Sequence, residues 1–395
     1  MKVNYICSRC HRRFAVNTFA YKCQCGGAFE LEKKPPKLPL GRLKSRANSI
    51  WRYREVLPII KDENIVTLGE GMTPLVEERI FDKEILLKLD YLFPSGSYKD
   101  RGASVLVSKI RELGIKTVVG DSSGNAGAAI TAYCARAGIT CEIYCPESAS
   151  EGKLVQISLY GAKLNKIPGS REDTAKVIQE KAKEVFYASH NWNPFFTEGT
   201  KTVFYEICEQ LNWEAPDSII MPAGYGSIIL GIALAGRELK DMGVINNLPK
   251  LVAVQTEAIP PIYEAFRKGE TKVTPLAKGR HTYAEGIACL NPIRGEQILE
   301  VLRETDGEVI KVSEEEIAEG INILAQKGIY VEPTSAVVVG ALRKSLKIKE
   351  GKTNVVILTG SGLKATDKIL RIFGREFAAK EQLKRSSLQK IDSPK

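Results

Sequence analysis

Along this chain, short apolar runs end in glycine-containing loops, and helical patterns follow them. The apolar runs are short and rich in β-branched residues, and they lie at 118–119, 219–221, 251–254 and 355–358. Helical patterns over 126–137 and 228–239 follow the first two runs. Strands that alternate with helices at this spacing form largely parallel sheets covered on both faces. We therefore predict an α/β fold.

The chain is long enough to form more than one hydrophobic core. Its 395 residues exceed what one small core organises, and the alternation occurs in two stretches, near 116–165 and 218–255. We predict two doubly wound parallel-sheet domains, preceded by a proline- and lysine-rich linker over 34–45. The predicted boundaries are an N-terminal module at 1–34, a large domain at 35–95 and 195–374, a small α/β domain at 96–194 and a basic tail at 375–395.

Cysteines near the N-terminus form two close pairs. Cys7 and Cys10 are spaced C-x2-C, and Cys23 and Cys25 are spaced C-x-C. Two pairs around a short loop can present four thiolates to a tetrahedral zinc ion, so we predict a zinc-ribbon-like module with structural zinc. The C-x-C spacing is shorter than usual, and His11 is an alternative ligand. The alternative is a cysteine-containing loop that binds no metal and is held in place by packing alone.

The cysteine count also bears on the compartment. Nine is an odd number, and no apolar targeting segment precedes Cys7. Both features argue against a disulfide framework and for reduced thiols, so we expect a cytoplasmic protein.

Charge and hydropathy narrow the choice of partners. The formal net charge of +10 favours an anionic partner, either nucleic acid or a phosphorylated small molecule. The cationic residues are scattered, and no interleaved aromatic platform accompanies them. We therefore expect a small phosphorylated substrate and no nucleic acid, with a zinc-ribbon nucleic-acid binder as the alternative. No apolar run reaches the roughly 20 residues of a membrane span, so we expect no membrane partner.

Three loops that follow predicted strands are candidates for ligand binding. They are Ser122–Gly127, Pro222–Ser227 and Thr359–Lys364. In parallel sheets ligands bind at the carboxyl ends of strands, where small residues admit a ligand and helix N-termini favour an anion. Asn125 adds an amide that can donate a hydrogen bond. Ordinary turns and helix caps are the alternative for all three loops.

One lysine stands out among small hydroxyl residues. Lys99 lies in the stretch Pro94–Gly102, at the start of a helical pattern. A lysine amine held partly away from water can attack an aldehyde. An ordinary solvated surface lysine is the alternative.

Taken together and in this order, the four segments resemble the fold-type-II pyridoxal-phosphate enzymes, whose fold is that of the tryptophan synthase β subunit. The resemblance covers nearly all of residues 60–370 and implies bound pyridoxal 5′-phosphate. By the resemblance, Lys99 holds the cofactor covalently and is the catalytic residue, Asn125 contacts its phenolic oxygen, and Thr359 faces its pyridine nitrogen. The cofactor phosphate would lie in the loop formed by Gly224, Tyr225, Gly226 and Ser227.

Further segments are similar to the threonine synthase branch of that family. They are Gly69–Leu75, Asn193–Phe195, Glu198–Thr202, Ala284–Ile287 and Glu332–Ala336, and a cysteine-rich ribbon also occurs in that branch. The resemblance implies a homodimer that converts O-phospho-L-homoserine and water into L-threonine and phosphate. The departures are the C-x-C spacing and Ser361 in the third loop. Alternatives within the family are a threonine or serine dehydratase, a cysteate synthase and an O-phosphoserine-dependent cysteine synthase.

Such a substrate needs a second anion site. We expect its phosphate to meet Lys201, Asn193, Arg171 and the hydroxyls of Ser122 and Ser123. A surface arginine is the alternative for Arg171. The substrate carboxylate is expected at the helix start over 122–126.

Overall fold

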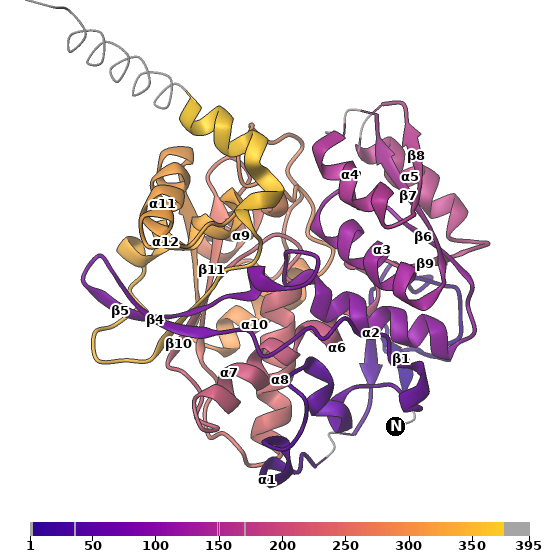
Figure 1. The fold of residues 1–395 in the computed structure, drawn as a ribbon, viewed down its shortest axis with the longest axis horizontal. Coiled ribbons are helices and arrows are strands. Elements are labelled where there is room, and N and C mark those ends of the chain that lie inside the picture. Colours follow the sequence, from indigo (N-terminus) through magenta and orange to yellow (C-terminus); the bar gives the residue numbers. More distant parts are fainter. Residues whose placement is uncertain (1–2, 35–36, 148, 150, 170, 375–395) are drawn as a thin grey trace, which may run out of the picture.

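The computed structural model describes residues 3–34, 37–147, 149, 151–169 and 171–374, although not the side chains of 151–153 and 171–172. The predicted basic tail at 375–395 therefore lies outside the described residues, as do Pro35 and Pro36 of the predicted linker. Two largely parallel sheets with helices around them confirm the predicted α/β fold (Figure 1). In the part of the chain that is described, no helix is long and apolar enough to cross a membrane.

The larger sheet has six strands in the order β12-β11-β10-β13-β5-β4. Its strands are β4 (Leu75–Ile80), β5 (Lys83–Lys88), β10 (Ser218–Pro222), β11 (Lys250–Thr256), β12 (Glu308–Val312) and β13 (Asn354–Ile357). Neighbouring strands are parallel except for β4, which pairs with β5 in an antiparallel hairpin at the edge. Ile219 of β10 lies opposite both Leu251 and Val355, so three of the predicted apolar runs form adjacent central strands.

Both faces of the larger sheet are buried. In β10, Ile219 and Met221 pack into one core, whereas Ile220 between them packs into the core on the opposite face. The helices associated with this sheet are α7 (Thr202–Gln210), α8 (Ser227–Asp241), α9 (Pro261–Arg267), α10 (Gly295–Glu304), α11 (Glu314–Gln326) and α12 (Pro333–Lys344). Burial on both faces explains why the runs at 219–221, 251–254 and 355–358 of the central strands are continuously apolar rather than alternating.

The smaller sheet has four parallel strands in the order β8-β7-β6-β9. They are β6 (Thr117–Gly120), β7 (Thr140–Pro146), β8 (Lys163–Ile167) and β9 (Phe186–Tyr187). The accompanying helices are α2 (Lys99–Glu112), α3 (Asn125–Ala137), α4 (Glu151–Leu159), α5 (Arg171–Lys181) and α6 (Pro194–Thr200). All four strands fall within the predicted small domain at 96–194.

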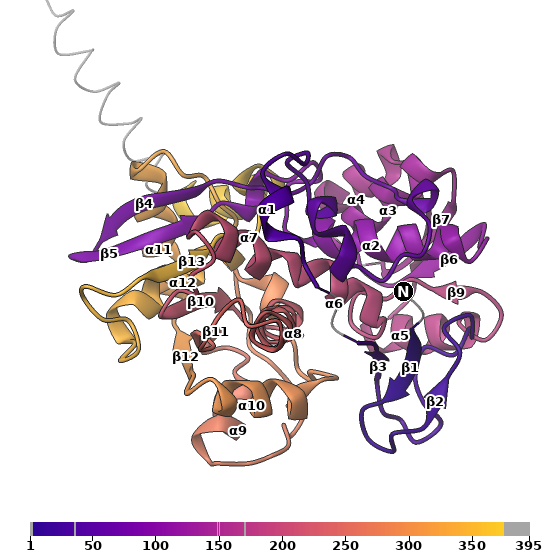
Figure 2. The same ribbon diagram turned by 90° about the horizontal axis from the view of Figure 1, so that it is seen from below.

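The N-terminal residues form a small antiparallel sheet that packs beside the smaller α/β unit (Figure 2). Its strands are β1 (Asn4–Cys7), β2 (Arg13–Phe14) and β3 (Phe29–Glu32), and a short helix α1 (Leu40–Leu43) follows. Tyr5 stacks on Phe29 at 5.0 Å between ring centroids. The buried Arg294, just before α10, donates to the Phe29 carbonyl at 2.8 Å and the Trp192 carbonyl at 3.0 Å. This arginine therefore joins the N-terminal sheet to both larger units.

A buried ionic cluster fixes the start of α2 against the larger sheet. The Arg101 guanidinium bonds to Asp90 at 2.8 Å and to Glu206 at 2.6 and 2.7 Å. Lys88 of β5 lies 2.9 Å from Glu206, and all four side chains are at most 1% exposed. Because Lys99 precedes Arg101 by two residues, this cluster also sets the position of Lys99.

Candidate functional site

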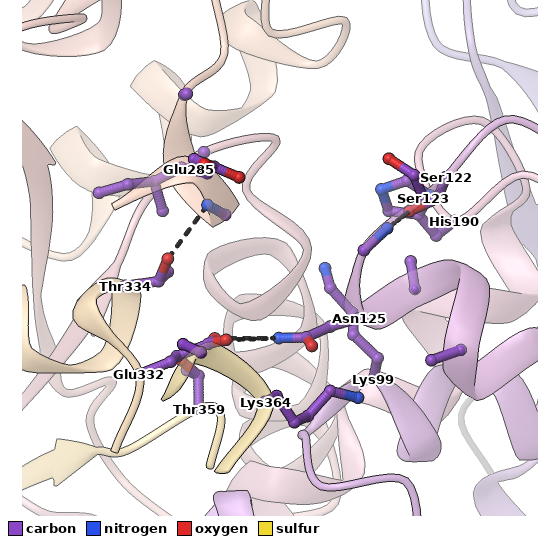
Figure 3. Close-up of a pocket in the computed structure, with 18 of the residues that line it drawn as sticks. Lys99, Ser122, Ser123, Asn125, His190, Glu285, Glu332, Thr334, Thr359 and Lys364 are labelled. Atoms are coloured by element: carbon purple, nitrogen blue, oxygen red, sulfur yellow. Dashed lines mark hydrogen bonds between the residues drawn. The ribbon is translucent and has the colours of Figure 1, made fainter. Parts of the chain in front are cut away.

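A cavity of about 1010 Å³ lies where loops of the two sheets meet (Figure 3). The loops after β6, β10 and β13 contribute to its wall, together with the N-terminal ends of α2, α3, α8 and α12. Of the residues predicted to bind cofactor or substrate, those that line the cavity are Lys99, Ser122, Ser123, Asn125, Gly224, Tyr225, Gly226, Ser227 and Thr359. The four segments singled out in the sequence therefore surround one volume.

Lys99 is connected to the glycine loop through its neighbour Tyr98. The Lys99 Nζ donates to the Tyr98 hydroxyl at 2.6 Å and lies 4.4 Å from the centroid of that ring. The Tyr98 hydroxyl lies 2.9 Å from the Ser227 Oγ, at the first residue of α8. Sequence reasoning missed Tyr98, although its place beside Lys99 in the motif was an available signal.

The loop after β10 lines the cavity and has room for glycine alone at two positions. Gly226 has φ +81°, and a Cβ there would overlap the Ile298 side chain. A Cβ on Gly224 would lie 3.0 Å from the Ile287 Cα. The loop ends at the N-terminus of α8, whose backbone N–H groups and dipole favour an anion. These features fit a phosphate group.

Asn125 begins α3 and reaches across the cavity. Its amide nitrogen donates to the two carboxylate oxygens of Glu332 at 2.9 and 3.1 Å (Figure 3). The loop before it is tight, because a Cβ on Gly127 would overlap the Ser122 carbonyl oxygen. Ser122 and Ser123 lie on the same wall.

Thr359 presents a neutral hydroxyl at the opposite wall. Its Oγ1 lies 2.9 Å from the Ser335 Oγ, and its backbone N–H donates to that oxygen at 2.8 Å. Nearby, the Lys364 Nζ donates to the Ser95 carbonyl at 2.6 Å and to the Gln156 Oε1 at 2.7 Å. Burial lowers the pKa of Lys364, an effect that the carboxylates of Glu332 and Asp100 oppose.

The donor set fits pyridoxal phosphate. It combines an amine for the aldehyde, a glycine cradle for the phosphate, an amide for the phenolic oxygen and a hydroxyl for the ring nitrogen. The most direct observation is the glycine loop, because a Cβ on Gly226 would overlap Ile298 and a Cβ on Gly224 would crowd Ile287, so side chains are excluded where the loop backbone lines the cavity.

Two residues predicted to contact the substrate phosphate are not brought to the cavity. Lys201 is fully buried, and its Nζ lies 2.6 Å from Glu198 and 2.8 Å from Glu238. Asn193 caps α6, with its Oδ1 accepting from the Phe195 N–H at 3.0 Å. Both side chains thus hold helices in place. Arg171 begins α5, but its side chain is outside the described residues.

Several cavity residues were not among the predicted site residues. Besides Tyr98 they include Gln156, His190, Glu285, Glu332 and Lys364. Glu332 and Glu285 lie in segments that carried the family resemblance, so their neighbourhood was a usable signal. Gln156 and His190 lie in segments with no motif of their own.

The predicted cysteine cluster is assembled. The Sγ atoms of Cys7, Cys10, Cys23 and Cys25 all lie within 4.8 Å of one another. Cys7 and Cys23 are buried, whereas Cys10 and Cys25 are exposed. The C-x-C spacing therefore does not prevent the four thiols from meeting, and such a group could hold a metal ion.

The chain is similar to known proteins over most of its length. Residues 66–360 match the model of the family described as pyridoxal-phosphate dependent enzyme. A threonine synthase from Methanocaldococcus jannaschii is 37% identical, covering 92% of this chain and 94% of that protein. A threonine synthase from Methanosarcina acetivorans is 34% identical, covering 93% of each. The crystal structure of a serine racemase from Dictyostelium discoideum aligns with a TM-score of 0.63 at 26% identity, covering 74% of this chain and 92% of that one.

Proposed function

This chain belongs to the pyridoxal-phosphate-dependent enzymes, and from that premise we propose that it is a threonine synthase. In the reaction, O-phospho-L-homoserine and water give L-threonine and inorganic phosphate. The observation that carries the proposal is that Lys99, Asn125, the Gly224–Ser227 loop and Thr359 line one shared cavity, in a chain 37% identical to a threonine synthase. It is a carbon–oxygen lyase, because the C–O bond to the phosphate is broken.

Four groups would hold the cofactor. The Lys99 amine would bind its aldehyde carbon, the Gly224–Ser227 loop its phosphate, the Asn125 amide its phenolic oxygen and the Thr359 hydroxyl its ring nitrogen. When bound, pyridoxal phosphate supplies an electron sink for a substrate carbanion. Because Thr359 is neutral, it does not force a proton onto the ring nitrogen as a carboxylate would.

The remaining steps belong to side chains of the protein. Once released from the cofactor, the Lys99 amine is the base that moves protons at the substrate Cα and Cβ. The N-terminus of α3, with Ser122 and Ser123, would bind the substrate carboxylate through N–H and hydroxyl donors. Arg171 stays a proposed contact of the substrate phosphate. Lys201 and Asn193 have no part in this proposal, because other contacts hold them in place.

The N-terminal cysteines would hold a structural zinc ion. Four Sγ atoms within 4.8 Å of one another match the donor set of a closed tetrahedral site. The module packs against α6 and, through Arg294, against the region before α10, so zinc would stabilise the assembled protein. It would not take part in the chemistry.

All nine cysteines are free, which supports a reducing compartment, and we place the enzyme in the cytoplasm. The homodimer implied by the family resemblance is part of the same proposal. Analytical ultracentrifugation at micromolar protein concentration would measure the mass of the assembly and so test whether it is a homodimer.

A product assay tests the function directly. The purified protein with pyridoxal phosphate should release phosphate from O-phospho-L-homoserine and form threonine in equal amounts. With threonine as the substrate it should form little 2-oxobutyrate. If 2-oxobutyrate from threonine is the main product instead, the protein is a dehydratase and the proposal fails.

A further inference from the structure

Within the described residues, the Asn125 amide donates its side-chain hydrogen bonds to one residue, Glu332. The two lie on different units, since Asn125 begins α3 beside the smaller sheet and Glu332 immediately precedes α12 beside the larger one. The amide nitrogen lies 2.9 and 3.1 Å from the two carboxylate oxygens, so the bond is shared between them (Figure 3). The bond thus spans the cavity.

The backbone holds Glu332 firmly at this position. Its N–H donates to the Gly360 carbonyl at 3.0 Å, and its own carbonyl accepts from the N–H groups of Ser335 and Ala336 at 2.9 and 3.2 Å. A Cβ at Gly360 would overlap the Glu332 carboxylate, so the absence of a side chain there leaves the room that the carboxylate occupies. Glu332 is therefore held between the start of α12 and the loop that carries Thr359.

The chemistry of the two groups fixes how the amide is turned. A carboxylate can only accept hydrogen bonds, so Asn125 must turn its NH2 group rather than its oxygen toward Glu332. One N–H is used by Glu332, and the second remains to donate to another acceptor. The phenolic oxygen of pyridoxal phosphate is such an acceptor, whereas the amide oxygen, if turned inward, would repel it.

We propose that Glu332 is a positioning residue that sets the orientation of the Asn125 amide for the cofactor. It acts through Asn125 and does not itself touch the reacting atoms. The proposal rests on the pyridoxal-phosphate part of the proposed function but not on the identity of the substrate. Without the carboxylate, the amide can rotate, and part of its hydrogen-bonding contribution to the cofactor is lost.

A double-mutant cycle on cofactor affinity tests this. The apo-protein variants are Glu332→Ala, Glu332→Gln, Asn125→Ala and the double variant Glu332→Ala/Asn125→Ala. Each is titrated with pyridoxal phosphate in the absence of substrate, and both the dissociation constant and the position of the bound cofactor's absorbance band are recorded. Glu285→Gln is the matched control, because this carboxylate lines the same cavity but pairs with Lys368 at 2.8 Å.

In the Asn125 background, Glu332→Ala should raise the dissociation constant about tenfold and shift the absorbance band, as loss of a charge-assisted orienting bond predicts. In the Asn125→Ala background the same change should cost less than about twofold, because no amide remains to be oriented. Glu285→Gln should match the parent. Equal losses in both backgrounds would overturn the proposal, because Glu332 would then act without Asn125.

The conservative variant protects the test against misfolding. Glu332→Gln keeps the size of the side chain but can turn either end of its own amide toward Asn125, so it should show an intermediate loss and a smaller band shift. If Glu332→Ala fails to fold, the cycle is run with Glu332→Gln, and parent-like affinity in that variant overturns the proposal. If the parent binds pyridoxal phosphate and the variants show the predicted losses, but the parent forms no threonine, the proposed substrate is refuted and the role of Glu332 stands.

Discussion

Replacing Arg101 with methionine should destabilise the protein far more than replacing an exposed arginine. Arg101 is fully buried and pairs with both Asp90 and Glu206, and methionine retains much of its length without the charge. The variant leaves two buried carboxylates with Lys88 as their remaining cation in the cluster. Removing one partner from a buried ionic cluster costs about 3–5 kcal/mol, because the charges that remain are uncompensated.

The same cluster holds Glu206 ionised. Burial alone would raise the pKa of Glu206, but the charges of Arg101 and Lys88 outweigh it and hold the pKa at about 2. Unfolding entropy of about 2.1 cal/mol/K per residue gives roughly 0.8 kcal/mol/K for a chain of 395 residues. A loss of about 4 kcal/mol therefore lowers the melting temperature by about 5 °C.

Calorimetry of the apo-protein measures this shift. Arg237→Met is the matched control, because Arg237 pairs with Glu304 while its side chain is 45% exposed. An exposed pair contributes at most about 1 kcal/mol, which corresponds to a shift of about 1 °C. If the two variants melt within about 1 °C of each other, the assignment of Arg101 as the anchor of α2 is refuted.

Three further predictions concern pH, the phosphate loop and the cysteines. Burial raises the pKa of Asp100 from 3.8 to about 7 despite two hydrogen bonds from Ser95, so the folded state keeps a proton that the unfolded state loses between these values. Relative to Asp100→Asn, the parent's free energy of unfolding should fall by up to about 1.4 kcal/mol per pH unit across that window, measured by urea titration; a constant difference contradicts this. Gly226→Ala should weaken pyridoxal phosphate binding at least about tenfold, because left-handed strain of about 1–2 kcal/mol and an overlap with Ile298 displace the loop whose N–H groups would bind the phosphate. Gly138→Ala has a similar φ in open space and should lower the melting temperature with no change in affinity; equal affinities in both variants refute the role of the loop. Cys7→Ser should lose zinc by elemental analysis and melt lower, whereas Cys208→Ser should keep the zinc of the parent, and parent-like zinc in Cys7→Ser would contradict the ribbon assignment.

The sequence predicted the central strands and the loops well because their signals are local. Val355–Leu358 and Leu251–Val254 are apolar at every position, and a strand buried on both faces requires that pattern. The glycines of the 224–227 loop report the space available to the backbone, which is also a local property. These signals located both sheets and the walls of the cavity.

The roles of individual polar residues were harder to predict, because they depend on partners far away in the sequence. Lys201 looked like a phosphate ligand, but its amine is buried between the carboxylates of Glu198 and Glu238. Glu238 comes from a distant segment and also pairs with Lys33. Asn193 was assigned to the substrate, although its spacing before Pro194 also fits a helix cap, which is what the structure shows. The role of Glu332 was not predicted, because nothing near it in the sequence indicates that Asn125, 207 residues away, is its hydrogen-bond partner.

Chemical trapping identifies the lysine that carries the cofactor. The protein is loaded with pyridoxal phosphate, the covalent link is reduced with borohydride, and the modified peptide is located by mass spectrometry. We predict that the cofactor is found on Lys99, and that Lys99→Ala carries none. Modification of another lysine in the parent, or of none, would show that Lys99 does not hold the cofactor.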